Sequence, residues 1–568
     1  MNPRPTAPKA VALAKLRYAP NGANSNRKAT FKTRASVKIL ISLYNIEMTF
    51  SKYPSYLKLQ ELSKKPVDLK SALTPARVQT YLAKALGLKL FFATERVSDE
   101  VLQELYALAH DAKAIQKMAA MQAGEKVNVI HGYPSEDRPA LHTAMRDFFD
   151  NPQGSPESKK ASTLALQEVD KLKKFIVKID HFTTLVQIGI GGSSLGPEAI
   201  CNSLGAFHRT GKQAFFVSNV DPDEISSVFK DLDLSRTGVI IVSKSGSTLE
   251  TLTNETFARD LFKKAGLKSE EHFMAVTQKA SPMDDPSRYL ASFYMWDYVG
   301  GRYSVTSMVG GAIIAFLVGI DHFMEFLKGA HAMDHHALTP DPKNNLPLLS
   351  ALLGIWNRDF LCYPTVAIIP YSYALRRFPA HLQQLDMESN GKRIDKEGRA
   401  VDFETGPIIW GEPGTNGQHS FFQLLHQGTT TVPLEIIGFM HSQNGQDIEV
   451  QKTSCQEKLL SNLLAQSIGL AQGETSDNPN KFFPGNRPNR ILLGERLDPY
   501  TMGLLLAYYE HKVAFQGFIW NINSFDQEGV QLGKVLAIKM MSQFAKTHGA
   551  SGDSYPLGEA YLKEMKSP

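Results

Sequence analysis

Two short polar segments carry the residue types best suited to binding an anion. The first, GIGGSSLGP (Gly189–Pro197), directly follows an apolar run at Thr183–Ile190. Glycines after a strand let the backbone approach a ligand closely, and the helix expected next offers free N–H groups to an anion. The spacing does not fit the dinucleotide fingerprint, because the sixth position is Ser194, and the Gly-Lys-Ser/Thr of a P-loop is missing. These differences argue against nucleotide binding.

The second segment, SKSGSTLET (Ser243–Thr251), follows another apolar run at Gly238–Ser243. It places four hydroxyl groups where a helix is expected to begin: Ser243, Ser245, Ser247 and Thr248. Hydroxyl donors and a helix N-terminus together suit a phosphate dianion. The alternative is an ordinary helix start with a capping box from Ser247 to Glu250. Two such loops on neighbouring strands favour phosphate, because parallel sheets bind ligands at the carboxyl ends of their strands.

Both segments resemble the sugar-isomerase domain loops of the phosphoglucose isomerase family. Four further stretches agree with that family in order: WDYVGGRYS (Trp296–Ser304), QLDMESNGK (Gln384–Lys392), GEPGTNGQHSFFQLLHQGT (Gly411–Thr429) and FDQEGVQLGK (Phe525–Lys534). Together the matching strings span roughly residues 185 to 534. The resemblance implies an α/β fold with two doubly wound parallel-sheet sugar-isomerase subdomains and a helical surround at both ends. It also implies reversible isomerisation of glucose 6-phosphate and fructose 6-phosphate, in glycolysis and gluconeogenesis.

The family's site residues carry over to matching positions of this chain. The resemblance implies these catalytic residues: Glu388, His419, Lys534 and Arg302. It implies these substrate- or phosphate-binding residues: Gly192, Ser193, Ser243, Lys244, Ser245, Gly246, Ser247, Thr248 and Gln384. The chain departs from the common family pattern at Ser194, Gly246, Leu249 and Glu528, and none of these changes removes a catalytic group.

The chemistry of a closed sugar ring explains why these residue types are needed. Ring opening needs an acid and a base, roles that the resemblance assigns to His419 and Lys534. Glu388 then moves a proton between C2 and C1 through a cis-enediol. Arg302 supplies a fixed positive charge to the developing enediolate. Taken singly, each residue has an ordinary structural explanation, and the functional interpretation depends on their joint occurrence.

This scheme requires no cofactor and no metal, and we expect activity to survive chelators. The only adjacent histidine pair, His335-His336, is followed by no obvious carboxylate ligand and is expected at the surface. The resemblance implies a homodimer with His419 contributed across the interface. Two alternatives stay open: a non-catalytic sugar-phosphate sensor, which would need only the phosphate loops, and an isomerase that also accepts mannose 6-phosphate.

Alternating patterns predict the elements that would hold this site. Residues 55–150 show apolar spacings of three and four, which predict helices. Short β-branched runs predict strands at Thr183–Ile190, Gln213–Ser218, Gly238–Ser243, Thr365–Pro370, Pro407–Trp410 and Leu434–Met440. Closing helices are expected near Tyr500–Asn521 and Lys534–Thr547. The predicted divisions are a basic extension (1–47), a helical N-terminal region (48–154), two sugar-isomerase subdomains (155–310 and 311–525) and a C-terminal helical segment (526–568).

Composition restricts the remaining classes of function. The formal charge of +5 is concentrated in residues 1–47, which hold nine Lys/Arg and one acid, so the rest of the chain is slightly acidic. General attraction to nucleic acid is therefore not expected. No long uninterrupted apolar stretch suggests a membrane span. The three cysteines show no CxxC pair, which suits a cytoplasmic protein. Residues 1–47 fit a transit peptide, a disordered tail or an upstream stretch before a start at Met48.

Overall fold

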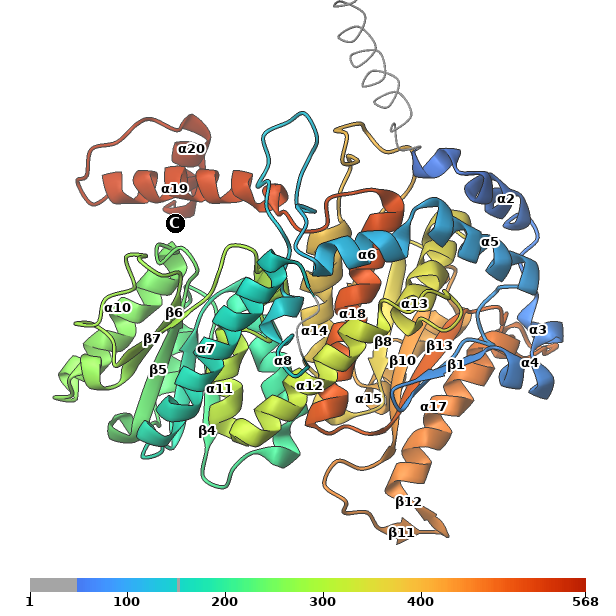
Figure 1. Cartoon of the computed structure of the whole chain (residues 1–568), viewed down its shortest axis with the longest axis horizontal. Coiled ribbons are helices and arrows are strands. Elements are labelled where there is room, and N and C mark those ends of the chain that lie inside the picture. Colours follow the sequence, from blue (N-terminus) through green and yellow to red (C-terminus); the bar gives the residue numbers. More distant parts are fainter. Residues whose placement is uncertain (1–48, 151–153, 568) are drawn as a thin grey trace, which may run out of the picture. The chain divides into compact units, whose positions relative to one another are not determined.

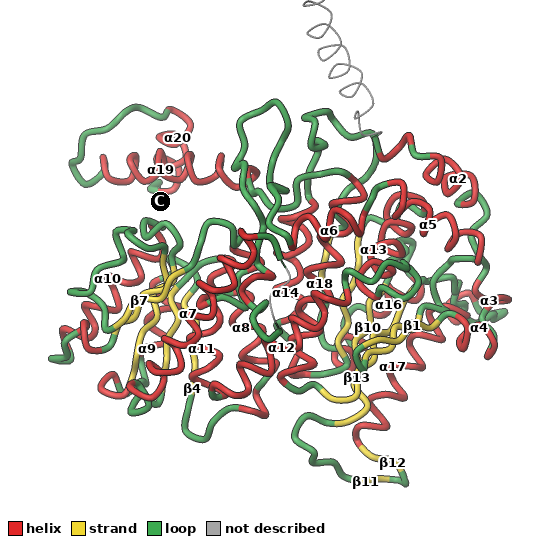
Figure 2. The backbone as a smooth tube through the Cα atoms, in the orientation of Figure 1, coloured by secondary structure: helices red, strands yellow, loops and turns green. Residues whose placement is uncertain are grey.

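The computed structural model describes residues 49–150 and 154–567. The chain divides into two units, Met1–Met48 and Thr49–Pro568, and the description below concerns the second. The predicted basic extension, 1–47, lies outside the described residues. Two large sheets organise the second unit, and a separate two-stranded sheet is formed by β11 and β12. The strands are yellow in Figure 2.

The first sheet has five parallel strands in the order β4-β3-β5-β6-β7. Strands β4, β5, β6 and β7 are labelled in Figure 1. Its central strands are apolar because helices cover both faces. Helices α9 and α10 pack on one face, and α7, α8 and α11 pack on the other. The strands are β3 (Thr184–Ile188), β4 (Gln213–Val217), β5 (Thr237–Val242), β6 (Phe273–Thr277) and β7 (Ala291–Tyr294). The helices are α7 (Pro156–Lys178), α8 (Leu195–Ser203), α9 (Pro222–Phe229), α10 (Leu249–Lys264) and α11 (Met308–Val318).

The second sheet has six strands in the order β1-β2-β13-β10-β8-β9. Strands β13, β10, β8 and β9 are parallel, whereas β2 pairs antiparallel with both β1 and β13. Its strands are β1 (Leu82–Ala85), β2 (Leu88–Phe91), β8 (Thr365–Pro370), β9 (Ile408–Trp410), β10 (Leu434–His441) and β13 (Asn489–Arg496). Helices α16 (Phe422–Gln427) and α17 (Cys455–Gln472) cover one face, and α13 (Leu346–Ile355) and α18 (Pro499–Trp520) cover the other.

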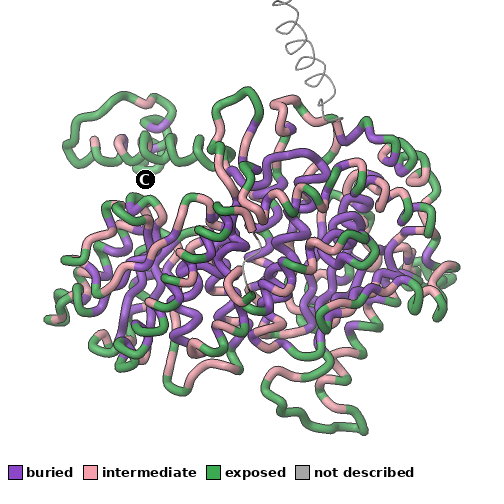
Figure 3. The backbone as a smooth tube through the Cα atoms, viewed as in Figure 1, coloured by how far each residue is buried: buried purple, intermediate pink, exposed green. Residues whose placement is uncertain are grey.

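Helix α18 lies in the core of the second unit, and every residue from Met502 to Trp520 is buried. Buried backbone is coloured purple in Figure 3. It packs along α12 (Ile320–His336). Glycines permit this contact: a Cβ on Gly503 would lie 2.0 Å from the Phe326 carbonyl oxygen, and one on Gly329 would lie 1.9 Å from that of Tyr500. The stretch Gly301–Val318 has the length and hydropathy of a membrane span, but 94% of it is buried inside the protein. It is a core segment.

Smaller elements complete the described chain. Those before the first sheet are α2 (Pro54–Leu62), α3 (Leu69–Ala72), α4 (Pro75–Thr80), α5 (Asp99–Asp111) and α6 (Ala114–Gln122). Those further along are α14 (Phe378–Gln383), α15 (Gly414–Gln418), β11 (Glu449–Val450), β12 (Thr453–Ser454), α19 (Gln531–Lys546) and α20 (Pro556–Met565). The α/β class with doubly wound sheets is confirmed. The N-terminal region differs from the helical expectation because β1 and β2 extend the second sheet.

Candidate active site

The first glycine-rich loop joins the two halves of the site through a close backbone contact. It follows β3, and Gly191 has a φ of +59°, a conformation that glycine adopts easily. A Cβ on Gly192 would lie 2.2 Å from the carbonyl carbon of Gly301 and 2.8 Å from the Arg302 nitrogen. A Cβ on Gly191 would lie 3.2 Å from the Gln384 amide nitrogen. The loop therefore sets the position of Arg302 and reaches Gln384.

Arg302 is almost fully buried, at 1% exposed, and its guanidinium is held by hydrogen bonds to two other chain segments. Its Nε donates to Ser389 Oγ at 2.7 Å. One terminal nitrogen donates to the carbonyl oxygens of Ser524 and Asp526, at 2.5 and 3.0 Å, and the other to Gln527 Oε1 at 3.2 Å. These contacts fix both the direction and the plane of a permanent positive charge.

Glu388 faces that charge. Its Oε2 lies 3.6 Å from Nη1 of Arg302 and accepts a hydrogen bond from Gln384 Nε2 at 3.0 Å. Both Gln384 and Glu388 belong to one π-helical turn, Gln384–Glu388, which follows α14. Turns of this kind are frequent at functional sites. The Glu388 side chain is 21% exposed, so the carboxylate is oriented by the protein and still reachable by a ligand.

Lys392 is a member of this site that sequence reasoning did not assign. Its Nζ donates to the carbonyl oxygens of Glu388 and Asp526, at 3.1 and 3.0 Å, and pairs with Asp526 Oδ1 at 2.8 Å. Burial lowers the pKa of Lys392, and the Asp526 carboxylate partly offsets that effect. Ser389, Asp526 and Gln527 were missed in the same way. All four residues lie inside the family motifs quoted above. That position was the only feature of the sequence that could have indicated a role in the site.

The second loop, between β5 and α10, concentrates hydroxyl groups at a helix start. Thr248 precedes α10 but makes no side-chain cap, and its hydroxyl lies 2.9 Å from that of Ser243. The alternative capping box from Ser247 to Glu250 is not formed. Ser247 instead donates through its backbone N–H and its hydroxyl to Ser245 Oγ, at 3.2 and 2.9 Å. The first amides of α10 therefore have no side-chain cap, which suits an anion.

Lys244 connects this loop to the segment that ends in Arg302. Its Nζ donates to the carbonyl oxygens of Val299 and Asp297, at 3.2 and 3.4 Å. Burial lowers the pKa of Lys244, and the nearby Arg138 adds to that effect. Gly246 has a φ of +65°, and a Cβ there would lie 3.0 Å from Ser281 Oγ. Both loops thus contact the segment Asp297–Arg302, which places them on the same side of the site as Arg302.

His419 and Lys534 are not brought into this cluster. His419 follows α15, Lys534 lies in the first turn of α19, and both residues are exposed. Within the described part of the chain, neither side chain makes a hydrogen bond or an ion pair. By contrast, His426 Nε2 lies 2.7 Å from Gln466 Oε1, as expected of a structural histidine.

None of the predicted site residues belongs to a group of potential metal ligands within residues 49–150 and 154–567. Such a group does exist elsewhere, and it comprises Asp147, His331 and His335. The half-buried His336 is structural, because its Nε2 accepts the Leu346 backbone N–H at 3.1 Å.

Comparison with known proteins identifies the family. The family model described as Phosphoglucose isomerase matches residues 91–555, which include every predicted site residue. The chain belongs to the phosphoglucose isomerase family. It is 56% identical to the glucose-6-phosphate isomerase of Protochlamydia amoebophila over 521 residues, covering 91% of this chain and 97% of that protein. It is 50% identical to the Chlamydia pneumoniae glucose-6-phosphate isomerase over 507 residues, covering 89% and 96%.

A solved phosphoglucose isomerase structure agrees with the fold. The crystal structure of a glucose-6-phosphate isomerase from Chlamydia trachomatis superposes with a TM-score of 0.88 at 48% identity. The match covers 91% of this chain and 99% of that one. The resemblance noted in the sequence is therefore confirmed at the level of the family and of the fold. The individual roles of the site residues remain predictions.

Proposed function

We propose that this chain interconverts glucose 6-phosphate and fructose 6-phosphate by ring opening and proton transfer through a cis-enediol. One observation carries the proposal: the Glu388 carboxylate lies 3.6 Å from the buried Arg302 guanidinium and is still partly exposed to solvent. Two anion-suited loops contact the segment leading to that arginine. The names of the relatives point to the same reaction.

Glu388 is the proposed base. It takes the proton from C2 of the open-chain aldose and returns it to C1, so that one carboxylate serves both directions. Gln384 holds one carboxylate oxygen at 3.0 Å, which limits rotation of the group. As the enediolate forms, negative charge develops on a substrate oxygen, and Arg302 stabilises it without reorganising because its own hydrogen bonds already hold it in place.

The phosphate group is proposed to bind at the second loop. Ser245, Ser247 and Thr248 offer hydroxyls, and the N-terminus of α10 offers backbone N–H groups. Lys244 adds a positive charge close by. Binding a phosphate far from C1 and C2 supplies energy that positions the reacting carbons against Glu388.

Ring opening is proposed to use His419 and Lys534, with His419 supplied by a second copy of the chain. The support is that both side chains are exposed and lack partners among the described residues. The surface of α19 and α20 also favours a homodimer. It exposes large apolar side chains in stripes along both helices: Leu532, Val535, Ile538, Met541, Phe544, Leu557, Tyr561 and Met565. Such a surface is typical of a protein interface.

The proposed mechanism uses acid–base groups and one guanidinium, so it requires neither a metal nor another cofactor. The protein is proposed to act in the cytoplasm, in glycolysis and gluconeogenesis. The slightly acidic body and the absence of a CxxC pair agree with that location.

The deciding experiment is a coupled assay of fructose 6-phosphate conversion to glucose 6-phosphate, run on the full chain with and without EDTA. Turnover that EDTA does not change is expected. Sugar-phosphate binding by calorimetry without turnover would instead support the sensing alternative. Turnover that EDTA abolishes and Zn²⁺ restores would contradict the metal-independent mechanism.

A further inference from the structure

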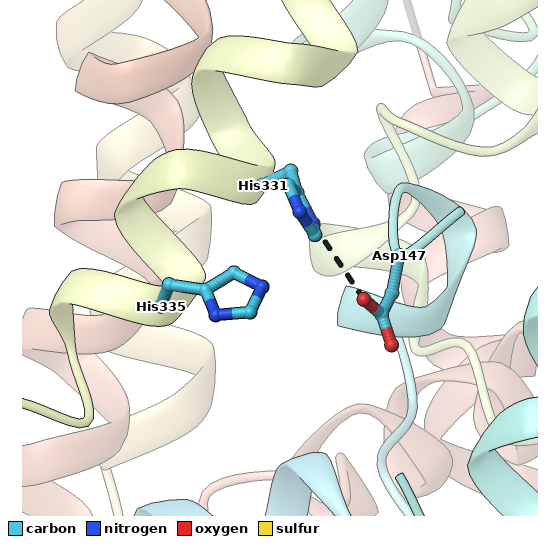
Figure 4. Close-up of side chains that lie close together, drawn as sticks. All are labelled: Asp147, His331 and His335. Carbon is cyan, nitrogen blue, oxygen red and sulfur yellow. Dashed lines mark ion pairs between the residues drawn. The ribbon is translucent and has the colours of Figure 1, made fainter. Parts of the chain in front are cut away.

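A cluster of two histidines and one aspartate lies outside the proposed active site (Figure 4). His331 and His335 come from α12, four residues apart, so they share one face of that helix. Asp147 comes from the loop after the short helical turn Thr143–Met145. One ligand atom from each of the three residues lies within 4.8 Å of the other two.

His331 is the central residue of this cluster, and one of its two ring nitrogens, Nδ1, has no hydrogen-bond partner. Its side chain is 6% exposed, and its buried Nδ1 makes no hydrogen bond. Asp147 Oδ1 lies 3.6 Å from this nitrogen, which is too long for a hydrogen bond but close to the separation of two ligands on one tetrahedral zinc ion. A buried, unpartnered imidazole nitrogen is costly unless a ligand satisfies it.

A second carboxylate faces the other side of the same ring. His331 Nε2 lies 3.5 Å from Asp150 Oδ2. Histidines that bind a metal through one ring nitrogen usually donate the other N–H to a carboxylate, which fixes the tautomer. Asp147 is therefore placed to bind the metal beside His331, and Asp150 is placed to accept a hydrogen bond from the other nitrogen of the His331 ring.

The two elements that carry the cluster are already fixed relative to one another. Arg146, next to Asp147, forms two hydrogen bonds to Asp334 on α12, at 2.8 and 2.7 Å. Asp334 lies directly before His335, and Arg146 is also paired with Glu510 of α18 at 2.7 Å. This buried network holds the loop against α12, so the three ligand groups are preorganised.

We propose that Asp147, His331 and His335 bind a divalent transition-metal ion, with Zn²⁺ as the ion best matched to two imidazoles and a carboxylate. Three protein ligands leave a fourth position for water, and the exposed His335 side gives access from solvent. The ion joins the loop that carries Asp147 to α12 and so stabilises the fold. It takes no part in the isomerisation proposed above.

The test uses the full chain, stripped with a chelator and then titrated with Zn²⁺ by calorimetry. One ion per chain is expected. The variants His335→Gln and Asp147→Asn are expected to weaken binding by about tenfold or more. His110→Gln, an exposed histidine on α5, is the matched control and should leave binding unchanged. Co²⁺ in place of Zn²⁺ should give the visible absorption of a low-coordinate site, and His335→Gln should remove it.

Thermal unfolding gives an independent readout. At a free Zn²⁺ concentration of about a hundredfold Kd, Tm should rise by about 2 °C in the parent and not in His335→Gln. Equal binding by the parent and His335→Gln would overturn the proposal. A failure of the parent to bind Zn²⁺ would also overturn it. Isomerase activity is measured on the same samples, so a failure here is distinguishable from a failure of the proposed reaction.

Discussion

The two parts of the proposed active site differ in how this chain holds them. Arg302 and Glu388 lie in a network whose members come from three chain segments, and Arg302 is 1% exposed. His419 and Lys534 are exposed and make no polar side-chain contact within the described residues. The first pair moves the proton between carbons in the proposed reaction, and the second pair opens the ring.

This difference indicates which chemical step one chain can organise alone. A group that stabilises developing charge must be fixed before the reaction, and the hydrogen bonds of Arg302 do this. A general acid or base also needs a defined position, which an exposed side chain does not have. The ring-opening groups therefore need a further surface, which in our proposal is supplied by a second chain packed on the apolar α19–α20 surface.

The largest effect is expected in the buried part of the site, which contains Arg302 and Glu388. Glu388→Gln should lower kcat by about 10²–10⁴-fold, because the amide cannot accept the proton, while it can still accept the hydrogen bond from Gln384. The measurement is the coupled assay together with calorimetry of substrate binding, which should change little. Glu449→Gln, in the exposed β11, is the control. A rate near that of the parent would exclude Glu388 as the base.

The next prediction concerns the exposed part of the site, which contains His419 and Lys534, and uses dimers of two different variants. His419→Ala and Glu388→Gln should each be impaired as homodimers. If His419 acts across the interface, a heterodimer of the two variants contains one intact site and regains roughly half the parent activity. If His419 acts within its own chain, neither site is intact and the activity stays low. Co-expression with two affinity tags isolates the heterodimer for this assay.

The strands with strong local patterns could be predicted from the sequence. The β-branched runs of β3, β4, β5, β8, β9 and β10 matched the structure closely. Strands β1 and β2 were missed because Leu, Ala and Lys favour helices, and pairing with β13 overrides that preference. Strands β6, β7 and β13 were also missed.

The types of the site residues could be predicted, but their contacts could not. Lys392 contacts both Glu388 and Asp526, which are far apart in the chain, and no local pattern reports such a contact. The same holds for Asp147 and His331, which only the packing of the loop on α12 brings together. The expectation from the sequence considered the neighbours His335 and His336, whereas the helix places His335 beside His331.

A smaller effect is expected at the phosphate loop. Ser245→Ala combined with Thr248→Ala should raise KM for fructose 6-phosphate by roughly tenfold or more, because hydrogen bonds to a charged group are lost. The effect on kcat should be smaller. Thr256→Ala, on the exposed side of α10, is the control. An unchanged KM would mean that the phosphate binds elsewhere and that the second loop is not part of the site.

The smallest effect concerns the stability of the buried part. Asp386 lies in the same π-helical turn as Glu388, and burial raises the pKa of its carboxyl to about 6, with Lys512 opposing and Glu435 adding to the shift. Between pH 4 and pH 6, by order of magnitude, the folded state then binds more protons at this group than the unfolded state. Its contribution to the free energy of unfolding therefore falls as pH rises through that window.

Asp386→Asn removes this titration. The free energy of unfolding of the variant relative to the parent should rise by on the order of 1–3 kcal/mol between pH 4 and pH 6, measured by urea denaturation at both ends of the window. Asp231→Asn, at an exposed position, is the control. A pH-independent difference for Asp386→Asn would show that Asp386 does not make the stability of this turn depend on pH. The buried and exposed parts of the site would then differ in their side-chain contacts but not in how pH affects their stability.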